Sequence, residues 1–175
     1  MIILVGASAT GKTEVGLALK RIYGINKVVT YTTRAPRAME KDGIDYNFIS
    51  KEEFLKLDHK GFFFETVKYN DNFYGTAKSS LNDDAYLILE PNGFLKYINS
   101  EYEIETFYLY TDEKTRFNRM IFRGDLEENA LKRIEIDRNI FDDEKLKRLA
   151  KHSIDVSNKT VDELANIVYT LSHKA

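Results

Sequence analysis

An eight-residue segment near the start of the sequence constrains the fold more than any other feature. The segment Gly6–Thr13 reads GASATGKT and fits the pattern G-x-x-x-x-G-K-[ST] in full. It follows an apolar run at Ile2–Val5 and precedes a helical pattern that begins at Lys12. Strand, loop and helix in this order form a phosphate-binding unit, because backbone N–H groups and the helix N-terminus attract phosphate oxygens. The sequence therefore predicts that a nucleoside triphosphate binds here.

This segment, called the phosphate loop below, supplies the first set of candidate binding residues: Gly6, Ala7, Ser8, Ala9, Thr10, Gly11, Lys12 and Thr13. Its glycines let the backbone curl around a phosphate, and Lys12 adds a full positive charge. The hydroxyl of Thr13 is a candidate ligand for Mg²⁺. The alternative is a glycine-rich turn without a ligand, and the complete order of strand, loop and helix favours nucleotide binding over it.

The pattern of apolar residues along the chain predicts the fold class. Short apolar runs that read as strands recur at Ile2–Val5, Lys27–Thr30, Phe62–Val67, Ala85–Leu89, Ile104–Tyr110 and Ile154–Val156. Helical patterns occupy Lys12–Tyr23, Glu52–Leu57, Phe94–Asn99 and Val161–Leu171, with a long charged stretch at Glu113–Lys151. Strand and helix alternate at both ends of the chain, which predicts an α/β fold with a parallel sheet flanked by helices.

Two segments break this alternation. Thr33–Tyr74 is rich in aromatic and charged residues and predicts an inserted mixed lobe beside the sheet. Arg123–Asn129 is polar, contains a glycine and interrupts two helical stretches, which is typical of a mobile helical lid. We therefore expect a single domain over residues 1–175, with the core at about 1–32, 77–118 and 139–175, the lobe at about 33–76 and the lid at about 119–138.

Composition excludes several classes of site and binding partner. The 175 residues include 26 Lys+Arg, 28 Asp+Glu and no cysteine, which excludes a disulfide scaffold, a thiol nucleophile and a cysteine metal site. The formal charge of −2 argues against bulk nucleic-acid binding. No stretch of the sequence is apolar enough to span a membrane. We expect a cytoplasmic protein, a monomer or homo-oligomer, that binds small anions and neither nucleic acid nor membrane.

A second candidate phosphate site lies in the inserted lobe. Arg34 and Arg37 stand three apart around Pro36, and Tyr46 follows after a turn. Proline stiffens the backbone between the arginines, whose guanidinium groups bind phosphate oxygens in pairs. The alternative for the arginines alone is a solvated basic turn.

This lobe segment and the phosphate loop together closely resemble the guanylate kinase family. The family pattern T-T-R-x-P-R-x-x-E-x-x-G-x-D-Y-x-F, which binds the nucleoside monophosphate, stands at Thr32–Phe48. The resemblance covers essentially the whole chain, through Gly61–Glu65, Asn72–Thr76, Arg119–Gly124, Lys132, Arg133 and Asn158.

The resemblance implies ATP and GMP or dGMP as substrates, direct transfer of the γ-phosphoryl group, and Mg²⁺ as cofactor. It implies that the acceptor phosphate is held by Arg34, Arg37, Tyr46 and Tyr74, and the guanine by Thr30, Glu65, Thr76 and Glu90. Lid residues Arg119, Arg123 and Arg133 would close onto the triphosphate, and Asn158 would lie beside the adenine. The catalytic residues would then be Lys12, Arg37, Arg119, Arg123 and Arg133.

The chain departs from the family at the strand Tyr86–Glu90. The family usually has two acidic residues, two apart, on this strand, whereas here only Glu90 is acidic and Ile88 occupies the earlier position. Because that earlier acid helps to organise Mg²⁺, we expect the ion to depend on Thr13, phosphate oxygens and water. Two alternatives remain: a kinase for another nucleoside monophosphate, and a noncatalytic binding module. The complete phosphate loop argues against the module.

Overall fold

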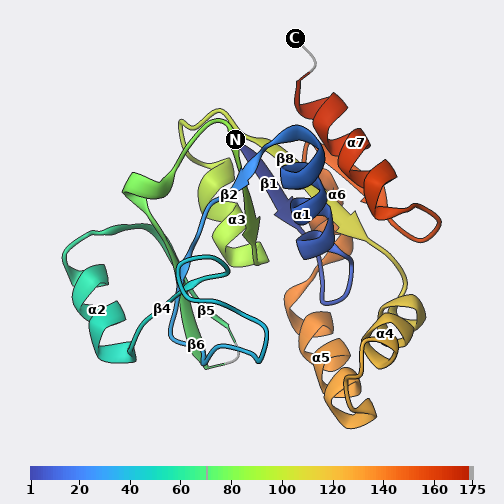
Figure 1. Ribbon diagram of the computed structural model, residues 1–175, viewed down its shortest axis with the longest axis horizontal. Coiled ribbons are helices and arrows are strands. Elements are labelled where there is room, and N and C mark those ends of the chain that lie inside the picture. Colours follow the sequence, from blue (N-terminus) through green and yellow to red (C-terminus); the bar gives the residue numbers. More distant parts are fainter. Residues whose placement is uncertain (70, 174–175) are drawn as a thin grey trace.

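A five-stranded parallel sheet forms the centre of the molecule (Figure 1). The computed structural model describes residues 1–69 and 71–173. The strand order is β2-β7-β1-β8-β9, formed by β1 (Ile2–Val5), β2 (Asn26–Lys27), β7 (Ala85–Leu89), β8 (Glu105–Tyr110) and β9 (His152–Asp155). The three central strands are almost continuously apolar and buried, as is typical of parallel strands covered on both faces.

Helices cover both faces of this sheet. Ile2 and Leu4 of β1 pack against α1 (Lys12–Tyr23) and α7 (Val161–Ser172). Ile3 and Val5 point the other way, into a cluster with residues of α3 (Pro91–Ile98) and α6 (Asp143–Leu149). Successive side chains of a strand face opposite sides of the sheet, so the apolar residues of one strand contribute to both clusters. The predicted α/β fold with a parallel sheet flanked by helices is confirmed.

A second, mixed sheet lies beside the first. Its order is β4-β3-β6-β5, formed by β3 (Tyr31–Thr32), β4 (Asn47–Phe48), β5 (Phe63–Tyr69) and β6 (Asn72–Ala77). The helix α2 (Lys51–His59) covers it through Phe54, whose ring stacks on Phe63 at 4.6 Å and on Phe73 at 5.5 Å between centroids. The 3₁₀ turn η1 (Lys78–Ser80) leads back towards the parallel sheet. The predicted inserted mixed lobe is therefore a sheet with one helix.

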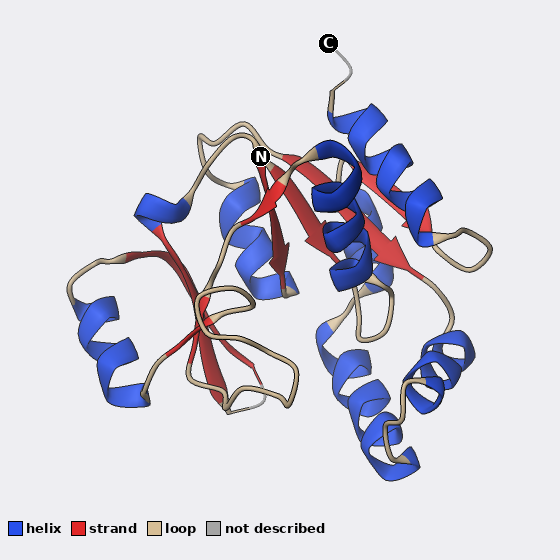
Figure 2. Cartoon of the chain, in the orientation of Figure 1, coloured by secondary structure: helices blue, strands red, loops and turns tan. Residues whose placement is uncertain are grey.

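Two helices project from the parallel sheet at the lower right of Figure 1, with the second sheet at the lower left. These are α4 (Glu113–Phe122) and α5 (Glu127–Ile140), joined by a turn in which Gly124 has a φ of 94°. Their shared core is a small cluster of Met120, Ala130 and Ile134. In Figure 2 the arrows of the parallel strands point to the region between this helix pair and the second sheet. This is the edge where open α/β sheets bind ligands.

Two predicted elements differ from the structure. The strand expected at 27–30 is divided between the sheets, because the Val28 N–H donates to Tyr86 O at 2.8 Å while Thr30 O accepts from Asn47 N at 2.8 Å. The charged stretch after residue 113 forms three helices, not two. Asp142 starts the third, since its side chain accepts a hydrogen bond from Lys145 N at 3.0 Å.

Candidate active site

The phosphate loop is shaped by close approaches and left-handed backbone. A Cβ at Gly6 would lie 2.4 Å from Leu109 O, so a side chain has no room there. Gly11 caps α1 with a φ of 92°, and Ala9 is also left-handed, with a φ of 61°, although it carries a Cβ. Among the described residues, no side chain caps the N-terminus of α1. A helix N-terminus that lacks a side-chain cap suits an anion.

Lys12 lies inside the curl of the loop. Its Nζ donates hydrogen bonds to the carbonyl oxygens of Gly6 and Ala7, the second at 3.0 Å. Burial lowers the pKa of the ammonium group, and the nearby carboxylates of Glu90 and Asp137 oppose that shift. The loop carbonyls therefore hold a positive charge at the place where phosphate is expected.

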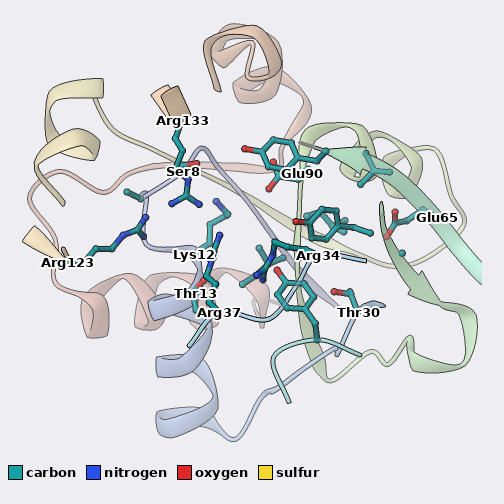
Figure 3. Close-up of a pocket in the computed structure, with 18 residues that line it drawn as sticks. Ser8, Lys12, Thr13, Thr30, Arg34, Arg37, Glu65, Glu90, Arg123 and Arg133 are labelled. Atoms are coloured by element: carbon teal, nitrogen blue, oxygen red, sulfur yellow. The ribbon is translucent and has the colours of Figure 1, made fainter. Parts of the chain in front are cut away.

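One cavity connects the loop with the second sheet and with the α4–α5 pair (Figure 3). Figure 3 shows side chains from all three parts pointing into it. Of the residues proposed from the sequence, its lining includes Ser8, Ala9, Lys12, Thr13, Thr30, Arg34, Arg37, Tyr46, Glu65, Tyr74, Glu90, Arg123 and Arg133. Segments far apart in the sequence thus contribute to one site.

The lobe side of the cavity contains an arginine–tyrosine cluster organised by Glu40. Arg34 donates to both carboxylate oxygens of Glu40, at 2.8 and 2.9 Å, and the Arg37 backbone N–H donates to the same carboxylate at 2.8 Å. The rings of Tyr46 and Tyr74 meet edge to face at 6.1 Å. Burial raises the pKa of Tyr46 to about 12, so its hydroxyl keeps its proton and remains a donor. The cluster offers guanidinium and phenol donors to an anion.

Glu65 lies deeper in the lobe. Its side chain is buried, and Oε1 accepts a hydrogen bond from Thr76 Oγ1 at 2.6 Å. Among the described residues, Oε2 has no hydrogen-bond partner. Burial raises the pKa of this carboxyl, while the bond from Thr76 opposes the rise. A buried oxygen without a donor is costly, so a ligand with N–H groups fits this position. Thr30, also buried, lines the same cavity.

The end of β7 contributes an apolar residue to the cavity, and Glu90, the N-cap residue of α3 directly after the strand, contributes an acidic one. Glu90 is half-buried near Lys12, and desolvation of its carboxyl raises the pKa while the lysine opposes the rise. Its Oε2 also has no partner among the described residues. Ile88 lines the cavity two residues earlier. An acidic residue at position 88 would add carboxylate oxygens to the cavity, whereas isoleucine adds none.

The lid arginines are held in different ways. Arg123 and Arg133 both contact Asp125 Oδ2, at 2.6 and 3.5 Å. Arg119 lines a second, more apolar cavity on the α4 side of the loop, and its guanidinium donates to Ala9 O at 3.3 Å and to Val156 O at 3.0 Å.

Some residues proposed from the sequence line neither cavity. These are Gly6, Ala7, Thr10, Thr76 and Asn158. The first three shape the loop; Thr10, for example, donates its hydroxyl proton to Ala7 O at 2.9 Å. Thr76 donates a hydrogen bond to Glu65, and Asn158 is exposed in the turn after β9.

Several residues near the site were not predicted from the sequence. Tyr69 lines the cavity, and burial raises its pKa to about 12. The period of two along β5 puts it on the same face as Glu65, so this spacing could have indicated it. Arg116 and Asp137 form a buried ion pair behind the loop, at 2.6 Å. They lie 21 residues apart on two helices, and no local pattern connects them.

Comparisons with known proteins agree with this geometry. A family profile described as guanylate kinase matches residues 1–166. A guanylate kinase of Aster yellows witches'-broom phytoplasma is 35% identical over 178 aligned positions, covering 95% of this chain and 80% of that protein. One from Prochlorococcus marinus is 30% identical and covers 98% and 95%.

Among solved structures, a guanylate kinase from Anaplasma phagocytophilum has the same fold. Its TM-score is 0.73 at 22% identity, and the match covers 100% of this chain and 87% of that one. With the family profile matching nearly the whole chain and relatives at 30% identity or more, this protein belongs to the guanylate kinase family.

Proposed function

We propose that the protein transfers the γ-phosphoryl group of ATP to GMP or dGMP, giving ADP and the nucleoside diphosphate. The observation that carries this proposal is the single cavity in which a complete phosphate loop faces an arginine–tyrosine cluster and a buried glutamate. A triphosphate on the loop and a monophosphate on the cluster would share this cavity. Family membership supports the same reaction.

The reaction requires two polyanions to approach in line, so charge neutralisation and positioning supply most of the catalysis. On the donor side the loop N–H groups and Lys12 hold the triphosphate, with Arg123 and Arg133 beside them in the cavity. On the acceptor side Arg34 and Arg37 hold the phosphate of the monophosphate. The acceptor oxygen is already ionised, so no side chain has to remove a proton from it.

The base pocket selects guanine through Glu65. Guanine presents two adjacent donors, N1–H and the exocyclic N2–H₂, and an ionised carboxylate accepts both. The unpartnered Oε2 of Glu65 supports this role. Adenine presents an acceptor at N1, which would leave the buried carboxylate unpaired at a cost of roughly 1–3 kcal/mol.

Mg²⁺ fits the site as an ion that arrives with ATP. The Thr13 hydroxyl and the buried, unpartnered Oε2 of Glu90 are oxygen ligands of the kind that Mg²⁺ takes, whereas Ile88 offers none. When bound, the ion neutralises charge on the β- and γ-phosphate oxygens. Thr13 and Glu90 would hold it on the protein side, with phosphate oxygens and water as its other ligands.

A coupled assay that detects ADP tests the proposal with GMP, dGMP, AMP, CMP and UMP as acceptors. We expect phosphorylation of GMP and dGMP and little turnover of the other three. Preference for another base would overturn the guanine assignment but leave the kinase assignment in place. ATP binding without turnover of any acceptor would indicate the noncatalytic module. The cytoplasmic location stays a prediction; among the described residues, no helix has the length and apolarity needed to cross a bilayer.

A further inference from the structure

The back of the phosphate loop rests on a buried ion pair that the proposed reaction does not use. Asp137 of α5 and Arg116 of α4 meet at 2.6 Å, and their side chains are only 1% and 6% exposed. Asp137 accepts hydrogen bonds from the Ser8 backbone N–H at 2.9 Å and from the Ser8 hydroxyl at 3.3 Å. Arg116 also donates to Ser8 O at 3.4 Å. One loop residue is therefore held at its N–H, its carbonyl and its side chain.

The next loop residue, Ala9, is fastened to the same helices. Its methyl group packs against the α4–α5 cluster of Met120, Ala130 and Ile134, and its carbonyl accepts from Arg119. Its φ of 61° is unfavourable for a residue with a Cβ. A strained conformation of this kind persists only where surrounding contacts enforce it. Contacts with α4 and α5 therefore help to fix the backbone conformation at Ser8 and Ala9.

A buried ion pair contributes little to stability compared with apolar residues of similar size, because both charges lose their hydration. The other hydrogen bonds described for these two side chains all go to Ser8 of the loop. We propose that Asp137, oriented by Arg116, is a positioning residue that fixes the phosphate loop in the curled conformation that receives the triphosphate. The inference rests on the proposed function in taking ATP as the ligand.

The test separates positioning from folding with a charge-free double variant. Arg116→Met with Asp137→Ala removes both buried charges together, so neither is left unpaired. The matched control is Glu113→Gln with Arg138→Gln. That pair also joins α4 to α5, with contacts of 2.7 and 2.5 Å, but it is exposed and no contact described for it reaches the loop.

Calorimetry of ATP binding, steady-state kinetics and thermal unfolding are then compared across the variants. We expect the double variant to unfold near the wild-type temperature and to raise the Kd and KM for ATP about tenfold, with KM for GMP within about twofold. The control should match wild type in every measurement. Unchanged ATP affinity in the folded double variant would show that the pair serves folding only. Tighter ATP binding would show that Asp137 competes with phosphate, and would also overturn the proposal.

A further measurement and a replacement variant allow the inference to be tested even if the proposed function is wrong or the double variant does not fold. In nucleotide-free protein, amide exchange over residues 6–13 should accelerate in the double variant and not in the control. This measurement needs neither ATP nor turnover, so a wrong proposed function and a wrong positioning role give different results. If the double variant does not fold, Asp137→Asn replaces it. The amide keeps the shape but turns a donor towards Ser8 N–H or Arg116, so faster loop exchange is again expected, and unchanged exchange would contradict the role.

Discussion

Lys12 donates hydrogen bonds to the carbonyl groups of its own loop, and burial lowers its pKa. A phosphate would replace those carbonyls with a full negative charge. We expect Lys12→Ala to lower kcat/KM by about a hundredfold or more while the fold stays intact, since the side chain belongs to a phosphate site. The kinetics should be read beside circular dichroism and against Lys20→Ala, an exposed lysine on the same helix. Near-normal turnover in folded Lys12→Ala would contradict the phosphoryl-transfer proposal.

Glu65 gives a prediction about pH. Burial raises its folded pKa above 4.5, so its protonated form becomes populated as the pH falls towards that raised value. A protonated carboxyl no longer accepts both guanine donors, so the KM for GMP should rise as the medium is acidified. Glu65→Gln should raise the KM for GMP about tenfold at pH 7 and flatten this dependence, since the amide does not titrate. A Gln variant with an unchanged GMP-over-AMP preference would refute the guanine assignment.

The same raised pKa has a consequence for stability. A carboxyl with a raised folded pKa contributes stability that is present below 4.5 and is lost as the pH rises through the folded value. Nucleotide-free Glu65→Gln should therefore unfold at a higher temperature than wild type at pH 7, and the difference should shrink in acid. Differential scanning calorimetry at both pH values measures this. A less stable variant at pH 7 would show that the Thr76 bond outweighs the cost of burial.

The isoleucine at position 88 leads to a prediction about Mg²⁺ affinity. With one acidic residue, Glu90, directly after β7, nucleotide-free protein should bind Mg²⁺ much more weakly than the ATP complex does, because Mg²⁺ gives up its waters reluctantly. Isothermal calorimetry with and without a nonhydrolysable ATP analogue tests this. Ile88→Asp, which restores a second acid, should strengthen the binding. A tight Mg²⁺ site in wild type without nucleotide is the contrary result.

At the scale of elements, the caps on the helices differ in completeness. Thr160 starts α7 with a full capping box: its Oγ1 accepts from Glu163 N at 3.2 Å, and its own N–H donates to Glu163 Oε2 at 2.8 Å. We expect Thr160→Ala to lower the free energy of unfolding by about 1 kcal/mol, because orphan N–H groups lose their partner. Denaturant unfolding measures this, with exposed Thr170→Ala on the same helix as the control. Equal stability of the two variants would contradict the cap's contribution.

Elements were predictable where local sequence decides them. The bounds of β1, α1 and β7 agree with the sequence prediction residue for residue, since each is an uninterrupted apolar run or an amphipathic pattern. The strands β3 and β4 have two residues each and are held by pairing with distant segments. Neither is long enough to show an alternation of polar and apolar residues. In the site, the motif residues were predictable from spacing. The Arg116–Asp137 pair was not, because it exists only once α4 packs on α5.

At the scale of the whole molecule, the described part of the chain passes between the two sheets twice, after β2 and after β6. The second sheet and the α4–α5 pair lie on either side of the cavity, so a movement of either changes its width. We expect ADP and GMP together, which cannot react, to reduce the radius of gyration measured by X-ray scattering. Closure of this kind excludes water from the transferring group. ADP alone is the control, and an unchanged radius with both ligands would indicate a preformed closed site.

Ala9 has a consequence for how this sequence can change. Its left-handed backbone favours glycine, yet its methyl group fills part of the cluster with Met120 and Ile134. A glycine at position 9 would relax the backbone and leave a gap between two helices more than a hundred residues further along the chain. The free-energy effects of substitutions at Ala9 and Ile134 should therefore be non-additive. Descendants of this sequence would reach a glycine loop most easily by enlarging the helix cluster first, so the order in which the two sites mutate matters.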